Sequence, residues 1–92
     1  MAKVIWSKKA IGQLKRILDY IAQDNPAAAI SYGEALLQHT EPLARFPESG
    51  TVVKRTSGRT YRTLVHGNYV IWYYKQGDAV RISKIVHGKR QS

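Results

Sequence analysis

The chain has 92 residues, no cysteine and a formal net charge of +9, from 15 Lys and Arg residues against 6 Asp and Glu residues. This length and composition exclude a second hydrophobic core, a disulfide framework and a thiolate metal site. We therefore expect a single domain spanning residues 1–92. The positive charge favours an anionic partner, which is nucleic acid, an acidic protein segment, or both.

The sequence contains no segment that would direct the chain to a membrane. The residues from Met1 to Ser7 lack the apolar run of a signal peptide, and no stretch approaches the roughly 20 apolar residues of a membrane-spanning helix. We therefore expect a cytoplasmic protein with no membrane partner. The histidines have no metal-ligand spacing, and no Walker loop or nucleophile elbow occurs, so neither a metal nor a cofactor is expected.

The first half of the chain predicts a strand and two helices. Residues 3–6 have the composition of a short strand, and Ser7 suits the N-cap of a helix of about four turns. Apolar residues then recur at three- and four-residue spacing, which is typical of an amphipathic helix. These residues are Ala10, Ile11, Leu14, Ile17, Leu18 and Ile21. Asn25 and Pro26 are typical of a new helix start, and Pro42 predicts a kink or a fresh turn at its end.

The second half predicts strands joined by turns. The β-favouring runs are residues 51–54, 60–65, 69–74 and 79–87. The third run is apolar on both faces, which indicates a central strand. Before them, Phe46 is expected to close one end of the core. Helices in one half and strands in the other predict an α+β fold with an N-terminal strand, an antiparallel helical hairpin and a mostly antiparallel β-meander sheet.

The pairing of these strands decides which side chains share a face of the sheet. We assume that Val65 opposes Tyr69 and that Tyr74 opposes Ala79, and side chains then alternate along each strand. We expect the helices to cover one face of the sheet and to leave the other uncovered. The residues expected on the uncovered face that could bind a ligand or transfer protons are Arg62, Trp72, Arg81 and His87. Guanidinium groups bind phosphate or carboxylate, an indole stacks on a base, and imidazole transfers protons near neutral pH. A central Trp and a strand-end His are also commonly structural residues.

Several motifs, in this order and at this spacing, resemble a known family. They are residues 4–7, 25–29, the Phe-Pro-x-x-Gly loop at 46–50, the aromatic strand at 69–73, and the His-Gly-basic-Arg ending at 87–90. Together they are similar to the RelE/ParE superfamily of small bacterial toxins, from type II toxin–antitoxin (plasmid stabilisation) systems. The resemblance covers nearly the whole chain, and its ending is similar to the ParE branch.

This resemblance implies the fold described above and a toxin that inhibits DNA gyrase and arrests growth. It also implies a cognate antitoxin whose C-terminal segment wraps the toxin and silences it. In this reading no residue is catalytic, and the chain works by binding its target. The residues expected to bind the target or the antitoxin are Arg62, Trp72, Arg81, His87, Lys89 and Arg90.

The RelE branch of the same superfamily implies a different activity, the ribosome-dependent cleavage of mRNA. Arg62 and Arg81 would then stabilise the scissile phosphate while its 2′-oxygen attacks, and His87 would protonate the leaving oxygen. No carboxylate is expected near these residues, because Glu48 and Asp78 lie in loops. We therefore favour gyrase binding, and enzymatic activity stays an alternative.

Overall fold

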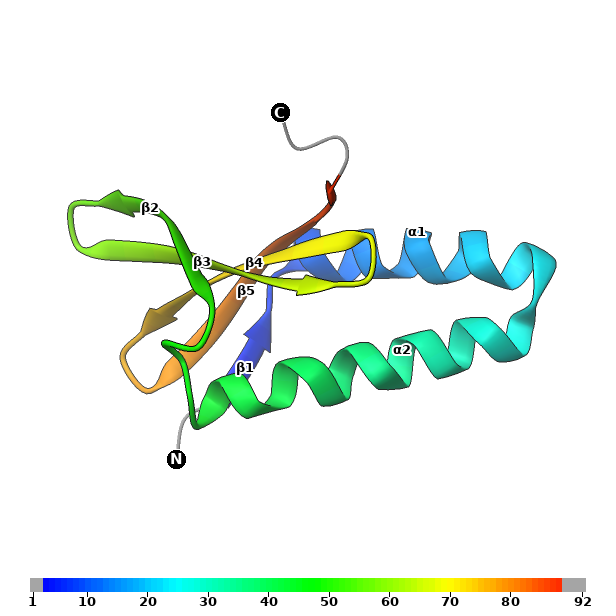
Figure 1. Cartoon of the computed structure of the whole chain (residues 1–92), viewed down its shortest axis with the longest axis horizontal. Helices are drawn as coiled ribbons and strands as arrows, with labels where there is room; N and C mark the ends of the chain where they lie inside the picture. The colour runs from blue at the N-terminus through cyan, green and yellow to red at the C-terminus, as the bar shows by residue number, and fades with distance from the viewer. Residues whose placement is uncertain (1–2, 89–92) are drawn as a thin grey trace.

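The structure is a computed structural model that describes residues 3–88 (Figure 1). Its elements are β1 (Lys3–Trp6), α1 (Lys8–Asp24), α2 (Pro26–Thr40), the 3₁₀ turn η1 (Glu41–Ala44), β2 (Thr51–Thr56), β3 (Arg59–His66), β4 (Tyr69–Gln76) and β5 (Ala79–His87). The predicted α+β class and order of elements are confirmed. The predicted fresh turn at Pro42 is η1, which follows α2 directly.

The strands form one five-stranded sheet in the order β1-β5-β4-β3-β2. β1 pairs with β5 in parallel, and every other pair is antiparallel. The helical hairpin packs along one side, and its α1–α2 connection projects beyond the strands (Figure 1). The molecule is therefore elongated, with extents of 43 × 33 × 21 Å. Among residues 3–88, β1 and β2 are the edge strands, so each has one side without a strand partner there.

The predicted helix caps are present. Ser7 Oγ accepts a hydrogen bond of 3.0 Å from the Ala10 backbone N–H, and it donates one of 2.8 Å to the Ser83 carbonyl oxygen. The second bond ties the start of α1 to β5. Asn25 Oδ1 accepts a bond of 3.0 Å from the Ala28 N–H at the start of α2. Both side chains satisfy backbone donors that a helix start would leave unpaired.

The core lies between the helical hairpin and one face of the sheet. Its buried side chains are Ala10, Ile17, Leu36, Leu43, Ile71, Tyr73, Val80, Ile82 and Ile85. Alternate residues of β4 and β5 supply this core, so the intervening residues of both strands point to the uncovered face. No helix within residues 3–88 has both the length and the apolar character needed to cross a membrane.

Tight turns set the strand register. β3 and β4 are joined by Gly67-Asn68 alone, and β4 and β5 are joined by Gly77-Asp78 alone. Gly67 and Gly77 both have a φ of 60°. Glycine adopts this left-handed conformation without a steric penalty, and it is the residue favoured at the first position of a type II′ hairpin turn. The prediction allowed for longer connections, and the strands extend further into these turns than expected.

The shorter turns change the strand pairing. Val65 pairs with Val70 instead of Tyr69, and the partner of Tyr74 is Arg81, further along β5 than predicted. A β-bulge between β4 and β5 shifts their register once more. Because a shift of one residue moves a side chain to the other face of the sheet, the predicted set of face-sharing residues is wrong for Arg62 and His87, whereas Trp72 and Arg81 stay on the uncovered face.

Candidate functional site

Arg62 and Arg81 lie on opposite faces of the sheet. Arg62 pairs with Tyr73, which is fully buried in the core, and Arg81 pairs with Tyr74 on the uncovered side. Directly paired residues direct their side chains to the same face. The predicted convergence of the two guanidinium groups is therefore wrong, and so is any site that requires both at once.

Arg62 holds the loop that precedes β2. Its Nη1 donates hydrogen bonds of 3.0 Å and 2.9 Å to the carbonyl oxygens of Glu48 and Gly50. The hydroxyl of Tyr73 donates to the Pro47 carbonyl oxygen at 2.9 Å and accepts from the Gly50 N–H at 2.7 Å. A Cβ at Gly50 would collide with that hydroxyl oxygen, so the position requires glycine. The Phe-Pro-x-x-Gly motif and Arg62 are thus one structural unit.

This unit exposes Phe46. The side chain is 62% exposed, so the prediction that it closes the core is wrong. Its N–H donates to the Pro42 carbonyl oxygen at 2.8 Å, and its own carbonyl oxygen accepts from the Ser49 N–H at 3.1 Å. These two bonds hold the Phe46 backbone, and the ring is presented to solvent.

His87 lies on the helix side of the sheet. It pairs with Tyr69, and the two rings are 5.3 Å apart and nearly perpendicular. The sheet thus separates His87 from Arg81, so the arrangement of Arg62, Arg81 and His87 expected for RNA cleavage is not formed. Two other predicted binding residues, Lys89 and Arg90, lie outside the described residues.

The uncovered face carries a different set of basic and aromatic side chains. Cross-strand pairing aligns Tyr61, Tyr74 and Arg81 in one row, and Trp72 and Lys84 in the next. Lys54 pairs with Tyr61 at the edge, and Arg59 precedes that tyrosine by two positions. We name the following residues the open-face cluster: Lys54, Arg59, Tyr61, Trp72, Tyr74, Arg81 and Lys84. It includes Trp72 and Arg81 from the predicted binding residues.

Two of the four cations of the open-face cluster, Arg59 and Lys84, lie on its aromatic rings. The Arg59 guanidinium is 4.0 Å from the Tyr74 ring centroid, and its Nη1 donates to the Tyr61 hydroxyl at 3.2 Å. Lys84 Nζ is 4.4 Å from the Trp72 ring centroid. These cation–π contacts hold positive charge against flat apolar surfaces. The cluster is therefore suited to an anionic partner that also offers aromatic or apolar groups.

A shallow hollow of about 340 Å³ opens beside this cluster. Its lining residues are Lys9, Lys54, Tyr61, Trp72, Ser83 and Lys84. The Trp72 indole Nε1 is buried and has no hydrogen-bond partner among the described residues. A buried donor without a partner costs free energy. The sequence prediction missed most of this cluster. The Gly-Asn and Gly-Asp turns indicate the pairing of β3 with β4 and of Tyr74 with Arg81, whereas the bulge that places Lys84 opposite Trp72 has no such signal.

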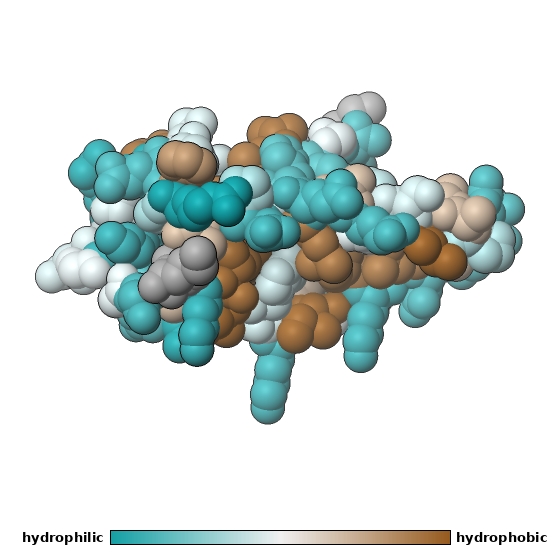
Figure 2. Space-filling model, turned by 90° about the horizontal axis from the view of Figure 1, so that it is seen from below, coloured by the Kyte–Doolittle hydropathy of each residue, from teal (hydrophilic) through white to brown (hydrophobic). Residues whose placement is uncertain are grey.

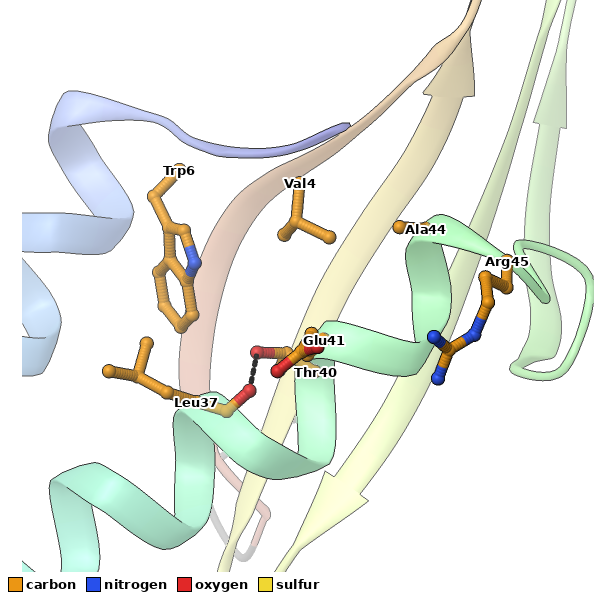
Figure 3. A pocket seen from close by; sticks show the side chains of 7 residues that line it. All are labelled: Val4, Trp6, Leu37, Thr40, Glu41, Ala44 and Arg45. Carbon is orange, nitrogen blue, oxygen red and sulfur yellow. Dashed lines mark hydrogen bonds between the residues drawn. The ribbon is translucent and has the colours of Figure 1, made fainter. Parts of the chain in front are cut away.

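A second feature is an apolar groove beside the edge strand β1. It has a volume of about 460 Å³ and is lined by Val4, Trp6, Leu37, Thr40, Glu41, Ala44 and Arg45 (Figure 3). Trp6 and Leu37 point toward each other across it, and Thr40 Oγ1 donates to the Leu37 carbonyl oxygen at 3.1 Å. Leu37 is 51% exposed. On this side of the molecule, hydrophobic side chains form a band between hydrophilic ones (Figure 2).

All three histidines of the chain lie in one row of rings on the helix side of the sheet. His39 of α2 contacts His66 of β3, with ring centroids 5.1 Å apart and the two Nδ1 atoms 2.9 Å apart. Tyr32 of α2 packs edge-on against His66 at 5.2 Å and against Tyr69 at 6.3 Å. Tyr69 in turn contacts His87. The row therefore connects α2 to the end of the sheet.

Burial changes the acid–base behaviour of this row. It lowers the pKa of His66, and the neighbouring His39 lowers it further. Burial also raises the pKa of Tyr32, with a smaller contribution from Tyr69. The Tyr32 hydroxyl is buried and has no hydrogen-bond partner among the described residues. Both groups are thus held in their uncharged forms at neutral pH.

Known proteins are similar to this chain in sequence and in fold. Residues 4–92 match the family described as ParE toxin of type II toxin-antitoxin system, parDE. Toxin RelE2 of Caulobacter vibrioides is 38% identical over 91 residues, which cover 98% of this chain and 99% of that protein. A solved chain of the chromosomal ParDE TA system from P. aeruginosa has a TM-score of 0.74 at 21% identity, covering 95% and 96% of the two chains. The predicted superfamily is confirmed: the chain belongs to the ParE toxin family of type II toxin–antitoxin systems.

Proposed function

We propose that this toxin acts by binding DNA gyrase and inhibiting its supercoiling activity, with no catalytic residue of its own. Family membership gives the coarser function, a type II toxin with a cognate antitoxin. The finer proposal rests on the location of His87. This imidazole lies beside Tyr69 on the helix side, across the sheet from Arg81.

Binding fits the uncovered face better than acid–base catalysis does. The open-face cluster contains lysine, arginine and aromatic side chains, and it has no histidine or carboxylate to transfer protons at neutral pH. Arg62 cannot join it, because its guanidinium holds the carbonyl groups of Glu48 and Gly50 on the other side. Aromatic and arginine side chains on a fixed surface are the typical anchors of protein–protein interfaces.

A supercoiling assay with purified gyrase and purified toxin tests this proposal. We expect the toxin to stop supercoiling, and the double variant Arg81→Ala/Lys84→Ala to need at least about tenfold more protein, because it lacks two interface cations. The matched control Lys15→Ala/Arg16→Ala removes two exposed cations from α1 and should inhibit like the unmodified toxin. Full supercoiling activity at a large excess of toxin would reject gyrase as the target.

Ribosome-dependent mRNA cleavage is the second candidate function, and the open-face cluster is the observation that favours it. Aromatic rings alternating with cations also suit single-stranded RNA, whose bases stack while its phosphates bind Lys and Arg. In this case Trp72→Ala and Lys54→Ala would abolish the cleavage of translated mRNA, and His87→Ala would leave it unchanged. Such cleavage, together with unaffected gyrase, would replace the first proposal by this one.

We further propose that the antitoxin covers the groove beside β1. The groove offers an apolar floor, and β1 presents a row of backbone groups with no strand partner. The high positive charge of the toxin favours an acidic, amphipathic segment as the occupant. The resemblance implied an antitoxin segment that wraps the toxin, and we propose this groove, between β1, α2 and η1, as the place where that segment binds.

A further inference from the structure

We propose that His39 and His66 form a binding site for one divalent transition-metal ion, with Cu²⁺ or Ni²⁺ preferred. The two residues come from the last turn of α2 and the last position of β3. A metal ion held by both would therefore connect the helical hairpin directly to the sheet. The site lies on the helix side, away from the open-face cluster, and it does not depend on the proposed function.

The distance between the two ring nitrogens carries this proposal. The Nδ1 atoms of His39 and His66 are 2.9 Å apart, in a hydrogen bond for which one ring donates and the other accepts. Imidazole binds such metals at about 2.0–2.1 Å, so two nitrogens at right angles about the metal lie about 2.9 Å apart, and about 3.3 Å apart in a tetrahedron. Square-planar and octahedral geometry is typical of Cu²⁺ and Ni²⁺. The metal would take the place of the shared proton.

The surroundings hold one ligand and leave the other adjustable. His66 is half-buried, and the ring of Tyr32 packs edge-on against it at 5.2 Å. His39 is exposed on the surface of α2, with its ring tilted by 47° to that of His66. For metal binding, the exposed His39 ring would rotate so that both nitrogen lone pairs point to a common metal position. A ligand fixed by its neighbours is what a preorganised metal site requires.

The site would use two protein ligands and water. Within residues 3–88 no group of three or more His, Cys, Asp or Glu side chains could hold a metal ion, so no third such ligand joins the pair. Because His39 is exposed, water can occupy the remaining coordination positions. Copper should bind more tightly than nickel, and nickel more tightly than cobalt, following the usual order of divalent affinities.

Titration of the untagged full-length chain with CuCl₂ and NiCl₂ at about pH 7.5, followed by calorimetry, tests the site. We expect one ion per chain and a rise in Tm of at least about 4 °C at metal concentrations a hundredfold above Kd. His39→Ala and His66→Asn should each lower the affinity at least tenfold. His87→Ala is the matched control, since it removes the one histidine outside the pair, and it should bind like the unmodified chain.

Three results would overturn the proposal. They are no binding at millimolar metal, unchanged binding in His39→Ala, and an equal loss of affinity in His87→Ala. If His66→Asn fails to fold, as judged by circular dichroism in the presence of chelator, the exposed His39→Ala variant still decides between a metal site and a simple hydrogen bond.

Discussion

Arg62 illustrates how a single cation can be structural although its residue type suggests a binding role. Its guanidinium donates hydrogen bonds to two loop carbonyl oxygens, and its cross-strand partner on β4 is the buried Tyr73. The sequence predicted that Arg62 lies in a strand. It did not predict which groups Arg62 binds, because these depend on the strand register, which is set by turns elsewhere in the chain. The caps Ser7 and Asn25 were predicted because their partners lie within three residues.

We expect Arg62→Ala to destabilise the protein by about 1–3 kcal/mol, because it leaves the carbonyl groups of Glu48 and Gly50 without their charged donor. Urea unfolding followed by circular dichroism measures this change. The control Arg55→Ala removes an exposed arginine from β2 and should change the stability by less than about 0.5 kcal/mol. Equal stability of the two variants would show that the loop does not need Arg62.

Alanine substitution at two glycines should change the stability of the fold in opposite directions. Gly50→Ala introduces a Cβ that meets the Tyr73 hydroxyl and the Thr63 carbonyl oxygen, so we expect a loss of about 1–3 kcal/mol. In Gly12→Ala, on α1, the added Cβ meets only the end of the Arg16 side chain, at 4.0 Å. This substitution should stabilise the protein by up to about 1 kcal/mol. Thermal unfolding of both variants gives the two signs. A stabilised Gly50→Ala protein would contradict the described loop geometry.

At the scale of elements, the sequence predicted the strands and helices well and their pairing poorly. Periodicity and capping are local signals, and they located β1, both helices and β5 correctly. Pairing depends on turn length, and two-residue turns at Gly67 and Gly77 moved each partner strand relative to the prediction. Of the predicted uncovered residues, Trp72 and Arg81 are on that face, whereas Arg62 and His87 are not.

The groove beside β1 gives a prediction for antitoxin binding. Leu37→Asp places a negative charge in its apolar floor, opposite Trp6, and should weaken antitoxin binding at least about tenfold. Ile30→Asp is the control, because Ile30 is 65% exposed on the same helix and does not line the groove. Calorimetry with the purified antitoxin compares the two affinities. Equal weakening by both variants would place the antitoxin along α2 instead.

At the scale of the whole molecule, the two surfaces lie on different sides of one thin sheet. The open-face cluster occupies the side without helices, and the groove lies between β1, α2 and η1 at the edge of the sheet. The two surfaces have no residue in common, so small changes on one surface should leave the other intact. Target inhibition and antitoxin neutralisation should therefore be separable by mutation.

Growth of bacteria producing toxin variants with and without the antitoxin tests this separation. Toxin carrying Leu37→Asp should still arrest growth when the antitoxin is present, because its open-face cluster is unchanged and its groove no longer binds. Toxin carrying Arg81→Ala/Lys84→Ala should permit growth without the antitoxin, yet bind the purified antitoxin within about threefold of the unmodified affinity. Loss of both properties in either variant would mean that the target and the antitoxin share the surface that this variant changes, so that neutralisation occurs by direct competition for it.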